Sequence, residues 1–331
     1  YKAQMISQPG EVLNVNTLMD DISRMPDWVL LEYGIALRPV DLRADEDGFI
    51  EVDLRQAVIY DIRLEGNEKT RDFVIERELT FQPGDVLDMN EIDRSLRRVL
   101  MLGFFDEINR TFTDGPSPDE QILTISVTER KTGSITGGIG YGTNDGWMVF
   151  AEIGEENLFG RGQRINVSVE FSTTRKTYDL GFYEPYIDSR GTSLGVNVYH
   201  RIAALDDEVD RRTTGGDLTF GRPVGEFSRA RLTLKGQNNT YTGGDFEDYN
   251  SRTVGVGLLT NTTDHPFFPT EGYKNNVSLE MGTSLFGGDA VFTKVELEHS
   301  RYFEVRDGGF VFAVRGLGGT VLTGELGESE K

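Results

Sequence analysis

Apolar and polar residues alternate with a period of two through most of the chain after about residue 132. Ile165, Val167 and Val169 take one parity, and the residues between them are polar. This period places successive side chains on opposite faces of a β-strand. We therefore predict a large antiparallel sheet of about eleven strands, with expected starts at Ser134, Gly146, Gly162, Arg175, Thr192, Arg212, Ser228, Ser251, Gly272, Ala290 and Gly309.

Two architectures fit this alternation. One is a transmembrane β-barrel, in which closure pairs every backbone group within lipid, and the other is a soluble sandwich with one wet face. No stretch approaches the roughly 20 apolar residues that a spanning helix needs. We expect long acidic connections such as 204–210 and 242–250 to alternate with tight ones such as 186–191, which favours the barrel. So do the aromatic residues near strand ends, Trp147, Tyr183, Tyr186, Tyr249, Tyr273 and Tyr302.

Charge and composition exclude several functions. The formal net charge of −21 repels phosphate backbones, which argues against nucleic-acid binding. The chain has no cysteine, so disulfides and thiolate sites are excluded. His200, His265 and His299 lie too far apart in sequence for zinc-hydrolase spacing.

An internal repeat occupies the part before residue 132, which holds only 7 of the 39 glycines. Residues 8–25 read QPGEVLNVNTLMDDISRM, and residues 82–99, offset by 74, read QPGDVLDMNEIDRSLRRV. A common turn before an arbitrary helix is the alternative, but matching caps (Asp88 or Asn90 in the second copy) and matching apolar faces favour a duplication. The apolar positions are Leu18, Ile22 and Met25 in the first copy and Ile92, Leu96, Val99 and Leu100 in the second.

Strand-like segments surround the second helix. Residues 58–64 alternate, 106–112 and 121–128 form a predicted hairpin, and 71–79 predict a short helix with Phe73, Ile75 and Leu79 facing inward. One unit is therefore strand–helix–helix–strand–strand. The first copy lacks its opening strand, and the chain begins at Tyr1 without an initiator Met or a signal-type run, so we expect a piece of a longer protein.

No pattern typical of catalysis stands out. The carboxylate pairs Glu155-Glu156 and Asp206-Asp207 are interpreted as solvated loop charges, and Asp264-His265-Pro266 as a turn. Gly137-Gly138-x-Gly140-x-Gly142 superficially resembles a phosphate loop, but it lacks a following Lys-Ser/Thr and is interpreted as a Gly-rich strand. We predict a protein that is not an enzyme and that uses no cofactor or metal.

Three further motifs lie at the ends of predicted strands: NLFGRG at 157–162, FYEPYI at 182–187 and NTTDHPFFPTEG at 261–272. Together with the duplicated PGxVL units, they resemble the BamA/TamA superfamily of outer-membrane β-barrel assembly factors, most closely its BamA branch. The resemblance covers essentially the whole chain. It implies α+β periplasmic POTRA domains followed by an all-β antiparallel transmembrane barrel in a bacterial-type outer membrane.

The expected domains are a truncated POTRA domain over 1–56, a complete one over 57–131 and a partial barrel over 132–331. About eleven strands of an expected sixteen are present, so we predict an open, curved sheet. The chain stops at 324–329, where the family's sixth extracellular loop would begin. The family's Arg-Gly motif is not assigned to Val314-Arg315-Gly316-Leu317, because these residues lie inside an alternating strand.

The resemblance implies an insertase that folds and inserts β-barrel proteins by strand templating at a lateral seam. Glycines weaken strand packing, and an opened edge offers backbone groups to an incoming strand. Relief of crowding where the barrel curves is the alternative explanation of these glycines. The predicted client-strand site is the first barrel strand: Ile135, Thr136, Gly137, Gly138, Ile139, Gly140, Tyr141 and Gly142.

The expected partners are unfolded outer-membrane β-barrel proteins, accessory periplasmic proteins or lipoproteins, and outer-membrane lipid. A two-partner-secretion pore or TamA-like translocation factor is the first alternative, and a plain porin or adhesin is the second. The duplicated periplasmic units argue against the porin. The helix face Asp93, Arg94, Arg97 and Arg98 is interpreted as a solvated surface without an assigned role.

Overall fold

The chain divides into two compact units in a computed structural model. Unit 1 is Tyr1–Thr132 with the turn Phe159–Gly162, and unit 2 is Gly133–Leu158 with Gln163–Lys331. The structure describes residues 5–7, 14–44, 50–143, 145–206, 208–264, 268–305 and 309–324.

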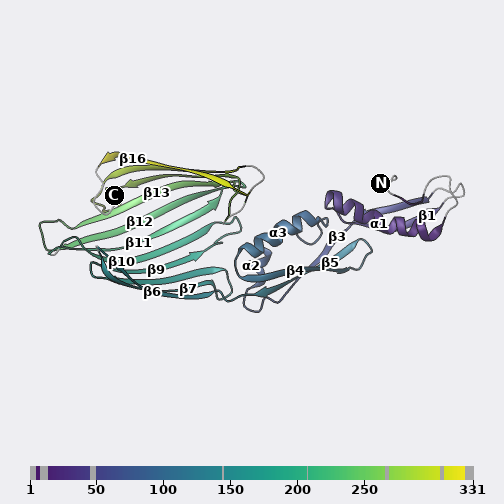
Figure 1. Ribbon diagram of the computed structural model, residues 1–331, viewed down its shortest axis with the longest axis horizontal. Helices are drawn as coiled ribbons and strands as arrows, with labels where there is room; N and C mark the ends of the chain where they lie inside the picture. Colours follow the sequence, from purple (N-terminus) through teal and green to yellow (C-terminus); the bar gives the residue numbers. More distant parts are fainter. Residues whose placement is uncertain are drawn as a thin grey trace. The chain divides into compact units, whose positions relative to one another are not determined.

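Unit 1 is an α/β unit with two small sheets (Figure 1). In the second sheet the central strand β5 pairs parallel with β3 and antiparallel with β4. This confirms the strand–helix–helix–strand–strand order predicted for the second repeat. The elements are α1 (Val15–Tyr33), β1 (Leu37–Ala44), β2 (Ile50–Gln56), β3 (Val58–Glu65), α2 (Asp72–Glu76), α3 (Met89–Met101), β4 (Phe105–Asp114) and β5 (Glu120–Glu129).

The core of unit 1 is built from β3, β5, α2, α3 and the residues that connect them. Burial alternates along β5, as a strand with one covered face requires. Two residues that were predicted to face inward are exposed instead: Phe73 by 46% and Leu100 by 44%. The next residue, Val74, is buried in place of Phe73, and the preceding residue, Val99, is buried beside Leu100. The buried apolar side chains are Ala57, Ile59, Val74, Ile75, Phe81, Leu87, Ile92, Leu96, Val99, Phe104, Phe105, Leu123, Ile125 and Val127.

The helices α1 and α3 begin in the same way. Asn14 caps α1 and Asp88 caps α3, each accepting hydrogen bonds from the backbone N–H groups two and three residues further on. The two caps are 74 residues apart, as the repeat requires. Of the two predicted caps in the second copy Asp88 is therefore correct, and Asn90 lies inside the helix.

A ring of three backbone hydrogen bonds lies where the two repeats of unit 1 meet, and two of the three cross from one repeat to the other. The Ala36 N–H donates to Leu87 O (3.3 Å), the Leu87 N–H to Ala57 O (2.7 Å) and the Ala57 N–H to Ala36 O (2.8 Å). They form a closed ring of donors and acceptors. Side chains add to this junction, because Asn90 Nδ2 donates to the Tyr33 carbonyl (3.5 Å) and Arg38 pairs with Asp114 (3.5 Å).

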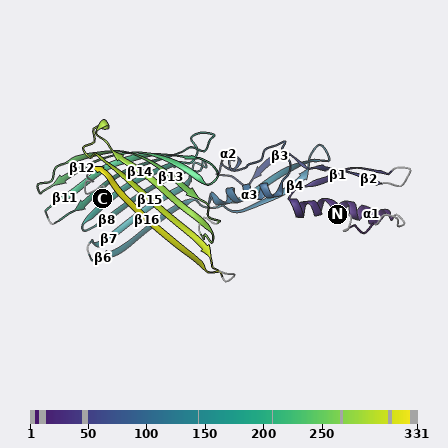
Figure 2. The ribbon, with the colours of Figure 1, turned by 90° about the horizontal axis from the view of Figure 1, so that it is seen from above.

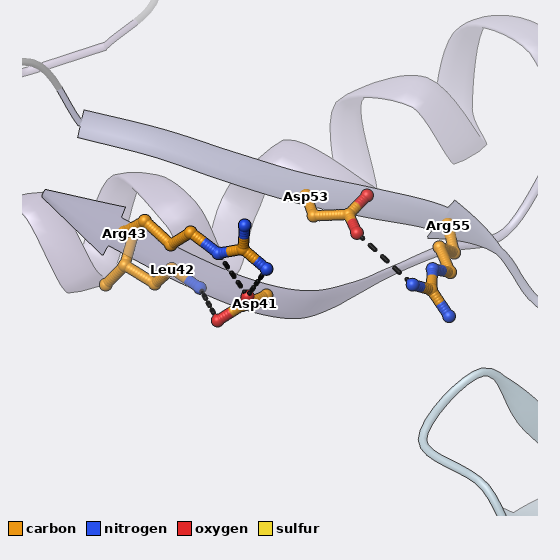
Figure 3. A network of polar contacts seen from close by, with 5 residues as sticks. All are labelled: Asp41, Leu42, Arg43, Asp53 and Arg55. Atoms are coloured by element: carbon orange, nitrogen blue, oxygen red, sulfur yellow. Dashed lines mark hydrogen bonds and ion pairs between the residues drawn. The ribbon is translucent and has the colours of Figure 1, made fainter.

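The β1–β2 hairpin carries exposed ion pairs within each strand (Figure 3). Asp41 accepts from Arg43 Nε (2.7 Å) and from the Leu42 N–H (2.9 Å), and Arg55 reaches Asp53 at 3.4 Å. The hydrogen bond from Arg43 and its charge lower the pKa of Asp41. Exposed pairs of this kind contribute little to stability because solvent screens them.

Unit 2 is one antiparallel sheet of eleven strands, each paired with its neighbours in sequence (Figure 1). Every predicted strand is present and begins within two residues of its expected start. The strands are β6 (Gly133–Gly142), β7 (Gly146–Leu158), β8 (Gln163–Ser172), β9 (Arg175–Glu184), β10 (Ser193–Ala204), β11 (Asp210–Pro223), β12 (Ser228–Thr242), β13 (Tyr249–Asn261), β14 (Gly272–Gly282), β15 (Phe292–Glu304) and β16 (Val311–Gly324).

The sheet of unit 2 is open and curved. Within the described residues β6 pairs only with β7, and β16 only with β15, so these two strands are its edges. In Figure 2 β16 passes across β6 to β8 in projection, as expected of a sheet that curls. This confirms the predicted open, curved sheet. Across the described ranges, no helix combines the length and apolarity needed to cross a bilayer.

The two faces of the sheet differ in chemistry. Leu218 lies opposite Leu234 on one face, which we name the apolar face. Asp217 lies opposite Lys235 on the other, the polar face. The same division continues into β15, where Glu280 lies opposite Lys294. Apolar side chains left exposed along one face of long strands are typical of the lipid side of a transmembrane barrel.

The predicted alternation of long and tight connections is wrong. The connection 185–192 is longer than the connection 205–209, although the first was expected to be tight. The reason is that β11 and β12 continue past their apolar segments. Asp210 still pairs with Thr242 at the end of the ladder, in residues whose acidity and polarity suggest a loop.

Candidate lateral seam and its attachment

The predicted seam residues form one edge strand. β6 pairs with β7 from Gly133, opposite Glu155, to Gly142, opposite Gly146, without a shift of register. On its other side no strand pairs with it among the residues that the structure describes. That side of β6 is the edge at which a further strand, of the same protein or of another, would pair.

The apolar face of this strand is strongly exposed. Ile135 is 84% exposed and Ile139 is 73% exposed. Tyr141 packs edge-to-face on Trp147 of β7 with ring centroids 5.5 Å apart. An incoming strand that paired with β6 would therefore place its side chains beside a row of large apolar residues.

The polar face of β6 is nearly bare because of its glycines. A β-carbon on Gly138 would lie 2.6 Å from the ring of Phe150, so the glycine lets that ring lie against the strand. A β-carbon on Gly140 would approach only the flexible end of Met148, at 3.5 Å. Crowding therefore accounts for Gly138 but not for Gly140.

Glu129, at the end of β5, holds the segment before α2. Its carboxylate accepts the backbone N–H groups of Lys69 (2.9 Å) and Thr70 (2.6 Å). Burial raises the pKa of Glu129, but the hydrogen bonds from the Thr70 side chain and from these two N–H groups outweigh it, so that the pKa is lowered. Lys69 Nζ also donates to Thr132 Oγ1 at 2.9 Å. The residues that immediately precede β6 are therefore fixed to the 69–70 segment.

The turn of the NLFGRG motif joins this arrangement within unit 1. The Arg71 N–H donates to the Gly160 carbonyl at 2.8 Å. Gly160 has φ +71°, and a β-carbon there would overlap the Lys69 carbonyl oxygen. Gly162 also has φ +71°, and its β-carbon would lie 2.5 Å from Arg77 Nη2. Both motif glycines are thus required by backbone conformation and by close approach.

Sequence reasoning missed the roles of Glu129 and Gly160. The motif was used only as a sign of resemblance. Two glycines within six residues at a strand end were the available signal for a close approach. Nothing in the sequence pairs Glu129 with residues 69 and 70, because that contact depends on the tertiary fold.

The other predicted features are dispersed. Asp93 pairs with Arg110 of β4, while Arg94, Arg97 and Arg98 are exposed. His200 contacts Thr214 (2.7 Å), and His299 contacts Asn275 (2.6 Å). These two histidines lie on different strands, β10 and β15. The ring of His200 also lies 6.2 Å from that of Tyr178, and the ring of His299 stacks on Tyr273 at 6.4 Å.

The acidic turn candidates are only partly described. Asp264 accepts from the N–H groups of Thr270 (2.8 Å) and Glu271 (3.0 Å), in keeping with the predicted turn. His265, Pro266 and Asp207 lie outside the described residues. The interpretation of Glu155-Glu156 as loop charges is wrong, because both residues lie within β7, where the Glu155 carboxylate accepts the Asn157 N–H at 2.9 Å.

An α/β unit with the POTRA order of elements, followed by a large antiparallel sheet with an exposed apolar face, is typical of outer-membrane β-barrel proteins that carry periplasmic POTRA domains. The Omp85 superfamily domain matches residues 157–330, and a POTRA model described as a surface antigen variable number repeat matches 57–130. The chain belongs to the Omp85 superfamily. Its strands lie in the outer membrane and its POTRA region in the periplasm, as predicted.

Two curated relatives carry the name outer membrane protein assembly factor BamA. The relative from Nitratidesulfovibrio vulgaris is 29% identical over 317 residues, covering 90% of this chain and 40% of the relative. The relative from Neisseria meningitidis serogroup B is 30% identical over 259 residues, covering 69% and 32%. The chain thus spans about a third to two fifths of the length of these relatives.

Solved structures show the same fold. BamA from Haemophilus ducreyi lacking POTRA domains 1–3 gives a TM-score of 0.64 at 22% identity, covering 95% of this chain and 66% of that one. CdiB from Escherichia coli gives 0.57 at 15% identity, covering 92% and 62%. At these identities the likeness concerns the fold alone.

Proposed function

We propose that the chain is part of an outer-membrane assembly factor that folds and inserts β-barrel proteins. The relatives named as assembly factors and the combination of POTRA region and membrane sheet support this role. Within it, residues 1–56 are part of one POTRA domain, 57–131 are a second, and 132–331 are a segment of the barrel. The partners would be unfolded β-barrel proteins, accessory periplasmic proteins or lipoproteins, and lipid.

The proposed mechanism is strand templating at β6. The observation that carries it is the glycine-rich first strand of the sheet, which forms a regular ten-residue ladder with β7 and whose other edge is where a further strand, of this protein or of a client, would pair. A client strand would add by β-augmentation. Its apolar residues would extend the row that Ile135, Ile139 and Tyr141 form on the apolar face.

The energetics favour this addition in a membrane. Alternate residues of an antiparallel strand direct both backbone groups to the same side, so about half of β6 points toward its free edge. Each backbone group left unpaired in lipid costs several kcal/mol. A client strand would remove that cost for itself and for β6 in one step.

Proline substitution in the full-length protein tests the template. Ile139 and Gly140 are adjacent, so only one of their two N–H groups faces the free edge. Ile139→Pro and Gly140→Pro each remove one backbone N–H donor. The variant whose N–H faces the free edge should keep the β6–β7 ladder intact but block client insertion in a reconstituted bilayer. Gly138 is less suitable because Phe150 lies over it.

Two controls accompany the proline variants. Thr136→Ser should be nearly silent. Gly195→Pro should impair folding itself, because Gly195 pairs on both sides, with Tyr183 and Thr219. If both proline variants of β6 fold and insert clients at the wild-type rate, the template is refuted. A translocation pore, in which the polar face carries the activity, would then be the better explanation.

A further inference from the structure

A groove of about 460 Å³ crosses β10 to β13 of unit 2. On the apolar face it is lined by Val198, Leu218, Leu234 and Val254, with Phe286 contributed by the connection after β14. Gly216 lies directly opposite Gly236 here, where the next outward-facing pair is Leu218 and Leu234. Two facing glycines among large side chains explain why the surface is hollowed at this place.

Arg252 of β13 forms one end of this groove. It lies opposite Gly236, whose missing β-carbon leaves room for the arginine stem, with Arg252 Cδ 3.4 Å from that position. Arg252 Nη1 donates to the carbonyls of Gln237 (2.7 Å) and Ser251 (2.8 Å), and Nη2 donates to Asn238 Oδ1 (2.8 Å). The guanidinium is therefore held in a fixed position.

All three acceptors are neutral. No carboxylate of the described residues forms an ion pair with Arg252. Asp289, on the neighbouring connection, accepts the Asn250 N–H instead, at 2.8 Å. A guanidinium has five N–H donors, so two of those on Arg252 are left for another group.

The position of Arg252 indicates which leaflet it meets. β6 begins directly after the periplasmic POTRA unit, and the strands then run alternately outward and back. β13 consequently begins at the outer end of the sheet, and Arg252 lies close to that beginning, Tyr249. A cation facing lipid is costly unless it meets the polar headgroups, as an arginine near the outer end of a strand does.

We propose that this groove binds one anionic, phosphate-bearing lipid of the outer leaflet. The phosphate oxygens accept the two remaining N–H groups of Arg252, because a guanidinium matches phosphate geometry. One acyl chain lies over Gly216, beside Val198 and Leu218. The chain's net charge of −21 does not oppose this contact, since distant charges are screened beyond about 8 Å. The site does not depend on the proposed assembly activity.

Native mass spectrometry of the full-length protein tests the site. The protein is embedded in phosphatidylcholine nanodiscs with a minor fraction of phosphatidylglycerol as probe, and the phosphatidylglycerol retained on release is counted. The wild type should retain one molecule. Arg252→Gln should lower retention roughly tenfold, since it removes a charge-assisted contact. Arg212→Gln, an exposed cation of the same face that does not line the groove, should retain it.

A second pair of variants tests the groove separately from the charge. Leu218→Trp fills the groove and should also abolish retention, whereas Val277→Trp, on the apolar face outside it, should not. If Arg252→Gln fails to fold, Arg252→Lys keeps the charge but loses the paired N–H groups, so its retention should fall below that of the wild type by less than roughly tenfold. Unchanged retention in Leu218→Trp, displacement of the lipid by inorganic phosphate, or equal retention of phosphatidylcholine would overturn the proposal.

Discussion

A β-carbon on Gly160 would overlap the carbonyl oxygen of Lys69, so the NLFGRG turn and the segment before α2 meet main chain to main chain. The Arg71 N–H to Gly160 carbonyl hydrogen bond is the polar part of this contact. Alanine at position 160 should therefore be unfavourable for two reasons: its β-carbon would overlap the Lys69 carbonyl, and its φ would be left-handed.

We predict that Gly160→Ala detaches this turn. The left-handed backbone alone costs alanine about 1–2 kcal/mol, and the overlap adds to it. Hydrogen exchange of the Arg71 amide in the full-length protein should therefore accelerate. Gly103→Ala is the matched control, with φ +78° and nothing within 4 Å of its β-carbon. Equal effects of the two variants on Arg71 exchange would contradict the contact.

Glu129 should make the same region sensitive to acid. Because its pKa is lowered in the folded chain, the hydrogen bonds it accepts contribute stability above its ordinary pKa of about 4.5. That contribution is lost as the pH falls through the lowered value. The protection factors of the Lys69 and Thr70 amides, which compare each exchange rate with the intrinsic rate at the same pH, should therefore fall on acidification in the wild type.

Glu129→Gln supplies the control for this pH dependence. The variant should exchange faster than the wild type at neutral pH, and the difference should shrink as Glu129 becomes protonated. A difference that persists unchanged below pH ~3 would show that charge on Glu129 is not what holds the segment.

The two glycines of β6 should respond differently to a larger side chain. Gly138→Val should destabilise the β6–β7 pair because Phe150 occupies the space, whereas Gly140→Val should be tolerated. Addition of Phe150→Ala should rescue Gly138→Val but leave Gly140→Val unaffected. Chemical denaturation of the full-length protein in detergent measures each step, and the absence of coupling between residues 138 and 150 would count against the contact.

We also predict that the two parts of the chain differ in solubility. Residues 133–331 should partition into detergent or bilayer as β-structure, because their exposed apolar face needs lipid. Residues 1–131 alone should stay soluble. Purification of 133–331 as a soluble, monomeric sandwich without detergent would refute the membrane interpretation of this sheet.

Periodicity predicted the strands of unit 2 well because each spans many repeats of the pattern. Single positions were less predictable. Phe73 and Leu100 are each one residue from a buried neighbour, and a shift of one residue turns a helical side chain by about 100°. The connection lengths failed because polar strand ends still pair, as Asp210 does with Thr242.

The sequence was enough to predict that the candidate seam is a strand, but not which side chains surround it. Its edge position follows from its place as the first strand of a sequential sheet. The overlap of Phe150 with Gly138 depends on register, which the alternation leaves undetermined. Likewise, in the sequence Arg252 is only one residue of an alternating strand. That no carboxylate of the described residues pairs with it can be recognised only from the three-dimensional structure.

The ring of main-chain hydrogen bonds through Ala36, Ala57 and Leu87 has a mechanical consequence. These hydrogen bonds do not depend on which side chains stand at the three positions, and bending the joint requires breaking several of them together. The two repeats of unit 1 should therefore carry a load as one stiff beam. A pull applied at the first repeat would reach the second as torque instead of being absorbed in a slack linker.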